Sequence, residues 1–140
     1  VISHGGLDVL IVEADTFETV AGAQLNIEEA SNVLERHKSI GIYLFARRGE
    51  EKKLSVSARF FAPGLDVVED PATGSAAGAL GGYLARILKF PADLLLSISQ
   101  GKEIGRPSSI RCDVHCDRGM VADVRVSGKV VKVGEGVILL

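Results

Sequence analysis

The run AAGALGGYLARIL at residues 76–88 limits the possible folds more than any other stretch of this sequence. It contains three glycines, namely Gly78, Gly81 and Gly82. Each glycine inside a helix costs up to about 1 kcal/mol relative to alanine. Close packing offsets this loss of stability only in an enclosed helix, because small residues let the surrounding strands approach closely. The run also lacks a polar face, so we predict a central, buried helix over residues 75–89.

Short β-rich segments flank this helix in the sequence. Apolar runs bounded by turn residues predict strands at residues 7–14, 41–47, 54–62, 94–99, 108–117, 120–127, 129–133 and 137–140. Residues 26–38 predict one outer helix, with Asn26 as its N-cap. Many short strands around one buried helix indicate an α+β domain, in which a mixed, curled or barrel-like β-sheet wraps around the helix.

The composition is that of one folded domain, residues 1–140, with no strong charge. The chain is 46% hydrophobic and 24% charged, which supports a core. Its formal net charge is −2, so we expect no nucleic-acid partner. No apolar run reaches the roughly 18–20 residues that span a bilayer, so we expect no membrane partner and a cytoplasmic location. The sequence begins at Val1, almost within a strand pattern, and we expect a fragment of a longer protein.

The two cysteines, Cys112 and Cys116, lie in the alternating stretch RCDVHCD, which predicts a strand. Four strand residues span roughly 13 Å, whereas a disulfide needs Cα atoms within about 7 Å. We therefore expect two free thiols that do not pair with each other. Alternation directs His115 to the opposite face of the strand from both cysteines, so we predict no metal site here.

Two adjacent acids, Glu69 and Asp70, stand directly before the loop PATGS at the start of the predicted helix. The first amides of a helix have no helical partners, and with the helix dipole they favour an anion. Glycine in this loop allows an unusual φ and a close approach of ligand to backbone. We predict a site in which Asp70 is the acid/base at the rim and the anion is held by Thr73, Gly74, Ser75 and Ala76.

A purely structural role explains the same residues. Ser75 or Asp70 would then cap the helix, which typically stabilises it by about 1 kcal/mol. Glu69 fits a solvated or loop-bracing carboxylate better than a catalyst. Neither Thr-Gly-Ser nor Asp-Pro is specific by itself, so the pattern alone leaves capping and anion binding open.

The run RFFAPGLDVVEDPATGSAAGAL, residues 59–80, resembles the signature of the phenazine-biosynthesis PhzF-like isomerase family. That signature is an Arg-x-Phe-x-Pro strand end, a short loop, and Glu-Asp-Pro-Ala-Thr-Gly-Ser-Ala entering a helix. Residues 100–108, QGKEIGRPS, resemble a second block of the family. The resemblance covers essentially all 140 residues but only the C-terminal half of a family member.

The resemblance implies a fold similar to diaminopimelate epimerase. In that fold two alike domains each wrap a sheet around a central helix, and the active site lies in the cleft between them. It also implies cofactor-free proton transfer between carbons. Asp70 takes the place of the family's active-site aspartate, and Gly74 and Ser75 take the place of the residues that hold the substrate carboxylate. Gly5 and Gly6 are matched to residues that line the cleft.

The main acid/base of the family is a glutamate from the N-terminal half, assisted there by a histidine. Neither has a counterpart in this sequence, because His4, His37 and His115 do not lie in a matching context. We therefore expect the C-terminal half of a PhzF-like isomerase, inactive alone. Its expected partners are a small carboxylate-bearing metabolite, the N-terminal half from the same or a separate chain, and further copies in a homo- or hetero-oligomer.

Two other functions fit the same fold. An amino-acid racemase or epimerase of this architecture commonly uses two cysteines at the helix entrances, and no thiol is present near Ser75. A non-catalytic anion-binding or assembly module would keep the loop and lose the chemistry. Arg59 would either brace its strand or pair with an acid near the loop, and we favour bracing. For Arg106 we expect solvent exposure or a structural salt bridge.

Overall fold

The computed structural model describes residues 2–4, 7–49, 52–65, 67–89 and 93–138. Within these ranges the chain forms eight strands, three α-helices and one 3₁₀ turn. In chain order they are β1 (Ile2–His4), β2 (Leu7–Glu13), α1 (Phe17–Gly22), α2 (Ile27–His37), β3 (Gly41–Arg48), β4 (Lys53–Ala62), η1 (Pro63–Leu65), β5 (Val67–Asp70), α3 (Gly74–Ile87), β6 (Leu94–Gln100), β7 (Ser108–Asp117) and β8 (Met120–Gly128).

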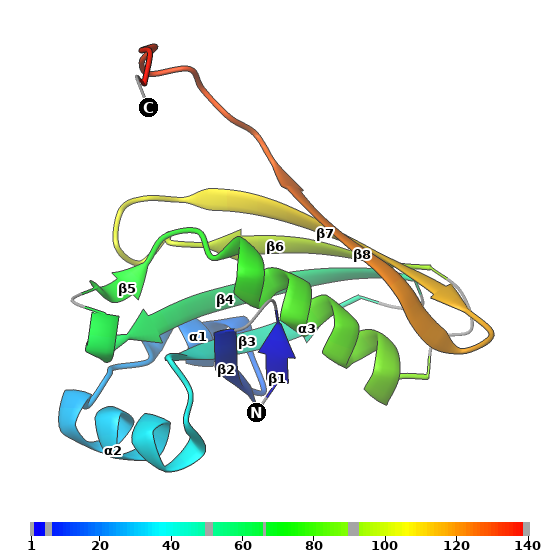
Figure 1. Cartoon of the computed structure of the whole chain (residues 1–140). Helices are drawn as coiled ribbons and strands as arrows, with labels where there is room; N and C mark the ends of the chain where they lie inside the picture. The colour runs from blue at the N-terminus through cyan, green and yellow to red at the C-terminus, as the bar shows by residue number, and fades with distance from the viewer. Residues whose placement is uncertain (1, 5–6, 50–51, 66, 90–92, 139–140) are drawn as a thin grey trace.

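The described strands form one mixed sheet in the order β1-β2-β3-β4-β6-β7-β8, and β5 pairs with the end of β4. The β2–β3 and β4–β6 pairs are parallel, and the other pairs are antiparallel. The sheet curls as a half-barrel, and α3 lies across one face of it, between β1 and β8 (Figure 1). This arrangement confirms the predicted α+β fold with a curled mixed sheet around one helix.

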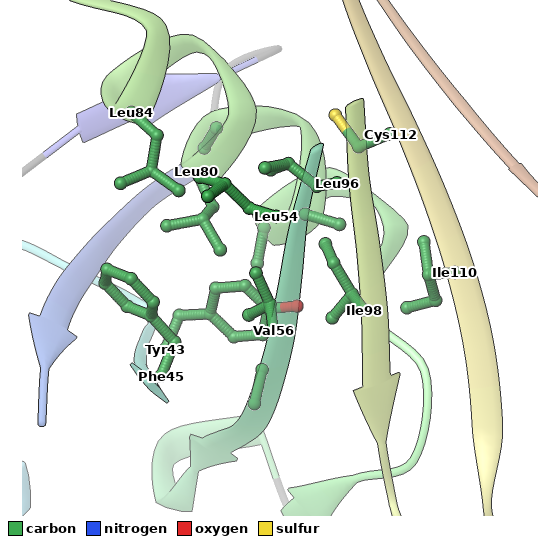
Figure 2. Packing of buried hydrophobic residues seen from close by; sticks show 14 of the residues in the cluster. Tyr43, Phe45, Leu54, Val56, Leu80, Leu84, Leu96, Ile98, Ile110 and Cys112 are labelled. Carbon is green, nitrogen blue, oxygen red and sulfur yellow. The ribbon is translucent and has the colours of Figure 1, made fainter. Parts of the chain in front are cut away.

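The hydrophobic core lies between α3 and the sheet face that it covers. Leu80 and Leu84 of α3 are fully buried and point toward the strands (Figure 2). Burying each such side chain stabilises the fold by about 1.5–3 kcal/mol. The strands supply buried partners to this core, among them Tyr43, Phe45, Val56, Leu96, Ile98 and Cys112. The observed helix, Gly74–Ile87, covers nearly the same residues as the predicted helix, 75–89.

The glycines of α3 have different surroundings. A Cβ atom added to Gly81 would lie 2.5 Å from Cys112 Sγ and 2.9 Å from Val114 Cγ2, so the close approach of β7 requires glycine there. A Cβ added to Gly82 meets nothing within 4 Å. The expected packing reason for glycine is therefore correct for Gly81 and wrong for Gly82, which lies on the half-exposed side of the helix.

Of the other two helices, α1 packs on β3 and β4, and α2 contacts the η1 turn. α2 follows the prediction closely, because the Asn26 side chain accepts a hydrogen bond from the Glu29 amide and caps the helix as expected. α1, which is capped by Thr16, was not predicted because its six residues are too few for a periodic pattern. Val20 of α1 is fully buried against the sheet. Among the described residues no helix is long and apolar enough to cross a bilayer.

The segment after β8 differs from the prediction. Two strands were predicted at 129–133 and 137–140, but residues 129–138 form no strand, and residues 139–140 lie outside the described residues. The β7–β8 ladder ends with Gly128 opposite Ile110, and β7 itself begins two residues earlier, directly after Pro107. The segment therefore runs past the end of its neighbour and away from the sheet (Figure 1). Its valines favour a strand only where a partner strand is present.

Candidate functional site

Strand alternation separates the two adjacent acids of the loop. Residues 67–70 form β5, which pairs with β4 so that Glu69 lies opposite Phe61 and Asp70 lies opposite Phe60. Phe60 belongs to the core on the α3 side, whereas Phe61 and Arg59 lie on the other face. Successive side chains of a strand point to opposite faces, so Glu69 and Asp70 reach different environments although they are neighbours.

Glu69 forms a buried ion pair with Arg59. The two carboxylate oxygens accept hydrogen bonds from Arg59 Nε and Nη2 at 2.8 and 2.7 Å, and the side chains are 8% and 10% exposed. The same guanidinium donates through Nη1 to the Ala23 carbonyl at 2.6 Å, just after α1. The hydrogen bonds to the Glu69 carboxylate raise the pKa of Arg59 above its usual value. Arg59 therefore joins β4, β5 and the end of α1. It pairs with an acid near the loop, which was the less favoured of the two expectations, and through this pairing Arg59 and Glu69 also brace the loop.

Asp70 lies on the inner side, at the start of α3. Its Oδ2 accepts a hydrogen bond of 2.7 Å from the hydroxyl of Thr73. Asp70 as a residue is of intermediate exposure. Among the described residues, no donor reaches its other carboxylate oxygen, Oδ1.

Gln100, at the end of β6, holds the loop through hydrogen bonds to Asp70 and Thr73. It was not predicted as a site residue. It is 1% exposed. Its Nε2 donates to the Asp70 carbonyl at 2.7 Å and to Thr73 Oγ1 at 2.9 Å, and its Oε1 accepts from the Thr73 amide at 3.4 Å and from the Tyr43 hydroxyl at 3.2 Å. The signal in the sequence is a polar residue at an inward position of the alternating strand, after Leu94, Leu96 and Ile98.

The turn after Gln100 packs directly on the loop. Gly101 has φ +78°, and an added Cβ would lie 2.7 Å from the Pro71 carbonyl and 2.4 Å from the Arg106 carbonyl. No side chain fits this position, which explains the glycine. The Arg106 amide donates a hydrogen bond to the Gly101 carbonyl at 2.8 Å. Arg106 is exposed, which was one of the two positions expected for it. The two sequence blocks that resemble the family thus meet in space.

The N-terminal end of α3 is open. Thr73 is the N-cap residue, but its side chain makes no capping bond. The first helical bond runs from the Ala77 amide to the Thr73 carbonyl, so the amides of residues 74–76 have no acceptor among the described residues. Gly74 and Ser75 are exposed, whereas Ala76 is buried. The alternative of a side-chain cap from Ser75 or Asp70 is thus not found in the described part of the chain.

Two predicted anion-binding residues have surroundings that the sequence did not indicate. Both polar groups of Thr73 are engaged inside the protein, because its amide and its hydroxyl bind Gln100 and Asp70. Gly74 does not have the unusual φ that was expected, and an added Cβ would make only an ordinary 3.7 Å contact with Val126. The anion-binding role of these residues stays a prediction, and Gly5 and Gly6 lie outside the described residues.

Exposed valines lie on β5, which precedes the loop, and on β8 beside Gly74. Val67 and Val68 of β5 are 45% and 53% exposed, and Val126 of β8, next to Gly74, is 40% exposed.

The cysteines lie away from this site. Both are free and buried on the core face of β7, and His115 between them is exposed, as alternation predicted. Burial raises the pKa of the Cys112 thiol to about 11, which keeps it protonated. Within the described residues there is no group of three or more His, Cys, Asp or Glu side chains that would hold a metal ion.

A curled mixed sheet around a buried helix, with an aspartate beside the open helix end, defines a domain of the epimerase-like class. A family model described as phenazine biosynthesis-like protein (PhzC-PhzF) matches residues 1–136, and the chain belongs to this family. An uncharacterized isomerase of Clostridium acetobutylicum is 32% identical over 149 residues, which cover 100% of this chain and 47% of that protein. The trans-2,3-dihydro-3-hydroxyanthranilate isomerase of Pseudomonas aeruginosa is 44% identical over 79 residues, 56% of this chain and 28% of that enzyme.

Solved structures have the same fold. A Bacillus anthracis phenazine biosynthesis protein of the PhzF family superposes with a TM-score of 0.64 at 22% identity, over 86% of this chain and 45% of that one. A predicted epimerase of Pseudomonas aeruginosa, PA4716, gives a TM-score of 0.58 at 25% identity, over 96% and 45% of the two chains. The chain thus spans at most about half the length of the relatives that it matches.

Proposed function

We propose that this chain supplies one wall of an isomerase active site in which a proton moves between two carbons of a small carboxylate-bearing substrate. The observation that supports this most directly is the partly exposed Asp70, held by Thr73, beside the open amides of Gly74 and Ser75. Amides at a helix N-terminus bind carboxylates well. A carboxylate bound there would bring the substrate's carbon skeleton next to the Asp70 carboxylate.

The proposed chemistry needs no oxidant or reductant. A base removes a proton from one substrate carbon, and the C–H electron pair stays in the unsaturated skeleton. An acid then returns a proton to another carbon, so the atoms of substrate and product are the same. General acid/base groups contribute typically about 10²- to 10⁴-fold to such steps. Asp70 supplies one of the two groups.

The second group and the rest of the cleft would come from an N-terminal half, on the same or a separate chain. The family's expected glutamate belongs to that half, so we propose that this chain alone is inactive. The exposed Val67, Val68 and Val126 at the rim fit a surface that such a half covers. We call the chain together with this half the assembled protein. We further propose that it works in the cytoplasm, where free thiols such as Cys112 persist.

A racemase or epimerase that uses two thiols is not favoured by this site. The thiols of Cys112 and Cys116 are buried on β7, and burial raises the pKa of both above the usual range. A thiol acts as a base only as its thiolate. Proton transfer by carboxylates therefore fits the described residues better.

The test is solvent deuterium incorporation by the assembled protein. The first substrate to assay is trans-2,3-dihydro-3-hydroxyanthranilate, which names the activity of several curated relatives. We expect the product to acquire carbon-bound deuterium in D₂O, and the rate in D70N to fall by about 10²-fold or more. The control is D113N, which changes an exposed aspartate of β7.

Two outcomes would contradict the proposal. Undiminished deuterium exchange in D70N would remove Asp70 from the chemistry. Saturable binding of carboxylates without exchange, by the assembled protein and over a panel of unsaturated carboxylic acids, would favour the non-catalytic binding module.

A further inference from the structure

A chain of buried hydrogen bonds connects the core to Asp70. Tyr43 and Gln100 are at most 1% exposed, and Thr73 is 9% exposed. The bonds run from the Tyr43 hydroxyl to Gln100 Oε1, from Gln100 Nε2 to Thr73 Oγ1, and from Thr73 Oγ1 to Asp70 Oδ2, at 3.2, 2.9 and 2.7 Å. These residues come from β3, β5, β6 and the N-cap position of α3, so the tertiary fold fixes their arrangement.

Two backbone groups determine which way the Gln100 carboxamide is oriented. The Thr73 amide only donates, so the atom 3.4 Å from it must be the oxygen Oε1. The Asp70 carbonyl only accepts, so the atom 2.7 Å from it must be the nitrogen Nε2. The Tyr43 hydroxyl then donates to Oε1. Its burial raises its pKa well above the usual value, so it remains a neutral donor.

The orientation of Gln100 in turn determines the direction of the Thr73 hydroxyl. Nε2 donates to Thr73 Oγ1, so this oxygen is an acceptor on that side. The single hydroxyl hydrogen is then directed to Asp70 Oδ2, which accepts it. Oδ2 thereby accepts one hydrogen bond, whereas Oδ1 accepts none from the described residues.

We propose that Gln100 and Tyr43 are positioning residues that hold the Thr73 hydroxyl as a donor to Asp70 Oδ2 and so reserve Oδ1 for the proton exchanged with substrate. Oδ1 takes a proton from a substrate carbon or gives one to it, while the Thr73 proton stays in place. This inference rests on the proposed function, because it names the reacting oxygen of Asp70. It makes Thr73 a positioning residue in addition to its predicted place near the anion.

The decisive comparison is between Thr73→Val and Thr73→Ser in the assembled protein. Valine has nearly the shape of threonine without the hydroxyl, whereas serine keeps the hydroxyl. We expect T73V to lower kcat by about 10- to 100-fold, because small misplacements of a reacting group have effects of that size. T73S should keep most of the wild-type kcat. KM should change less than kcat, because the substrate carboxylate binds the amides of α3 and not this hydroxyl.

Variants deeper in the chain of hydrogen bonds test its direction. Gln100→Met removes the carboxamide at similar length and should lower kcat about as much as T73V. Tyr43→Phe removes one of two donors to Oε1 and should have a smaller effect, about 2- to 10-fold. Ser99→Ala is the control, because Ser99 is exposed on the opposite face of the same strand. Wild-type kcat in T73V, or equal losses in T73V and T73S, would overturn the proposal.

A second measurement separates this inference from the proposed function. Solvent exchange of the Thr73 hydroxyl proton, followed by NMR in the assembled protein, requires no turnover. We expect slow exchange in the wild type and exchange at least about 10-fold faster in Q100M, as for a proton released from a buried bond. If Q100M does not fold, Y43F replaces it, with a smaller acceleration. Fast exchange in the wild type overturns the positioning role. Slow exchange in a protein without deuterium incorporation instead overturns the proposed function alone.

Discussion

Glu69 and Asp70 are adjacent carboxylates with opposite surroundings. The side chain of Glu69 is 8% exposed, and its two carboxylate oxygens accept hydrogen bonds from Arg59 Nε and Nη2. Asp70 is partly exposed and receives one bond, on one oxygen, from a neutral hydroxyl. A fully paired buried carboxylate stabilises structure and has no free oxygen, whereas a half-paired one at a surface keeps an oxygen for a ligand. The alternation of β5 directs the two side chains to these two environments.

Each side has its own support from distant parts of the chain. On the Glu69 side, Arg59 of β4 also binds the carbonyl of Ala23 after α1. On the Asp70 side, Gln100 and Gly101 at the end of β6 hold the backbone of residues 70–73. We therefore expect that breaking the ion pair of Glu69 lowers stability, whereas removing the charge of Asp70 leaves stability nearly unchanged and affects the site.

The largest stability effect is expected for Arg59→Met. Removing one partner of a buried ion pair leaves the other charge without compensation, which costs about 3–5 kcal/mol. The free energy of unfolding from urea denaturation measures this directly. A loss below about 1 kcal/mol would mean that Glu69 is solvated and that the two carboxylates do not differ as described.

Gly101→Ala tests the support of Asp70. The added Cβ would approach the Pro71 and Arg106 carbonyls within 3 Å, at a left-handed φ. We expect a loss of about 2–4 kcal/mol, from the conformation and from the contacts together. Gly105→Ala is a matched control with φ +70° and no atom within 4 Å of the new Cβ. Its loss should be only the conformational part, about 1–2 kcal/mol. Equal losses in both variants would show that the turn does not press on the loop.

Glu69→Gln and Asp70→Asn compare the two acids with the same chemical change. E69Q removes a buried charge that binds Arg59, and we expect a loss of stability of about 1.5–3 kcal/mol. D70N keeps an oxygen that accepts from Thr73, so its stability should stay within about 1 kcal/mol of the wild type. Parallel denaturation curves measure both. A reversed order of the two variants would contradict the roles assigned to the two faces of β5.

The smallest effect is expected for Arg111→Met on the outer face of β7. Arg111 binds Asp113 through two bonds of 2.6 and 2.7 Å, the same geometry as Arg59 with Glu69. Its side chain is 59% exposed, so water and salt screen the pair. The midpoint of urea denaturation should match the wild type at moderate salt. A shift as large as that of R59M would show that burial is not what distinguishes the two pairs.

The sequence was sufficient for features that depend on local pattern. The buried helix followed from its apolar run and its glycines, and α2 followed from its cap and spacing. Asp70 was singled out by its place before a helix end, and Glu69 was predicted to be a solvated or loop-bracing carboxylate, of which the second is observed. These predictions depend on residues within a few positions of each other, where periodicity and capping rules apply directly.

Features that depend on contacts between distant strands were not accessible in the same way. Gln100 is 30 residues from Asp70 and reaches it only because β6 lies parallel to β4, beside β5. The hydrogen bonds of Thr73 to Gln100, and of Arg59 to the carbonyl of Ala23 after α1, likewise depend on tertiary contacts. The strand predictions within residues 129–138 were wrong because their β-favouring valines have no neighbouring strand among the described residues.

The central claim is that the open amides of α3 hold a carboxylate next to Asp70. The most direct measurement is a titration of the ¹⁵N-labelled protein with anthranilate, a stable aromatic carboxylate, with aniline as the control that lacks the carboxylate. Anthranilate should produce saturable shifts of the Gly74, Ser75 and Ala76 amide signals, larger than those of any other amides, and aniline should leave them unchanged. Equal shifts with both compounds, or shifts located elsewhere on the domain, would contradict the claim.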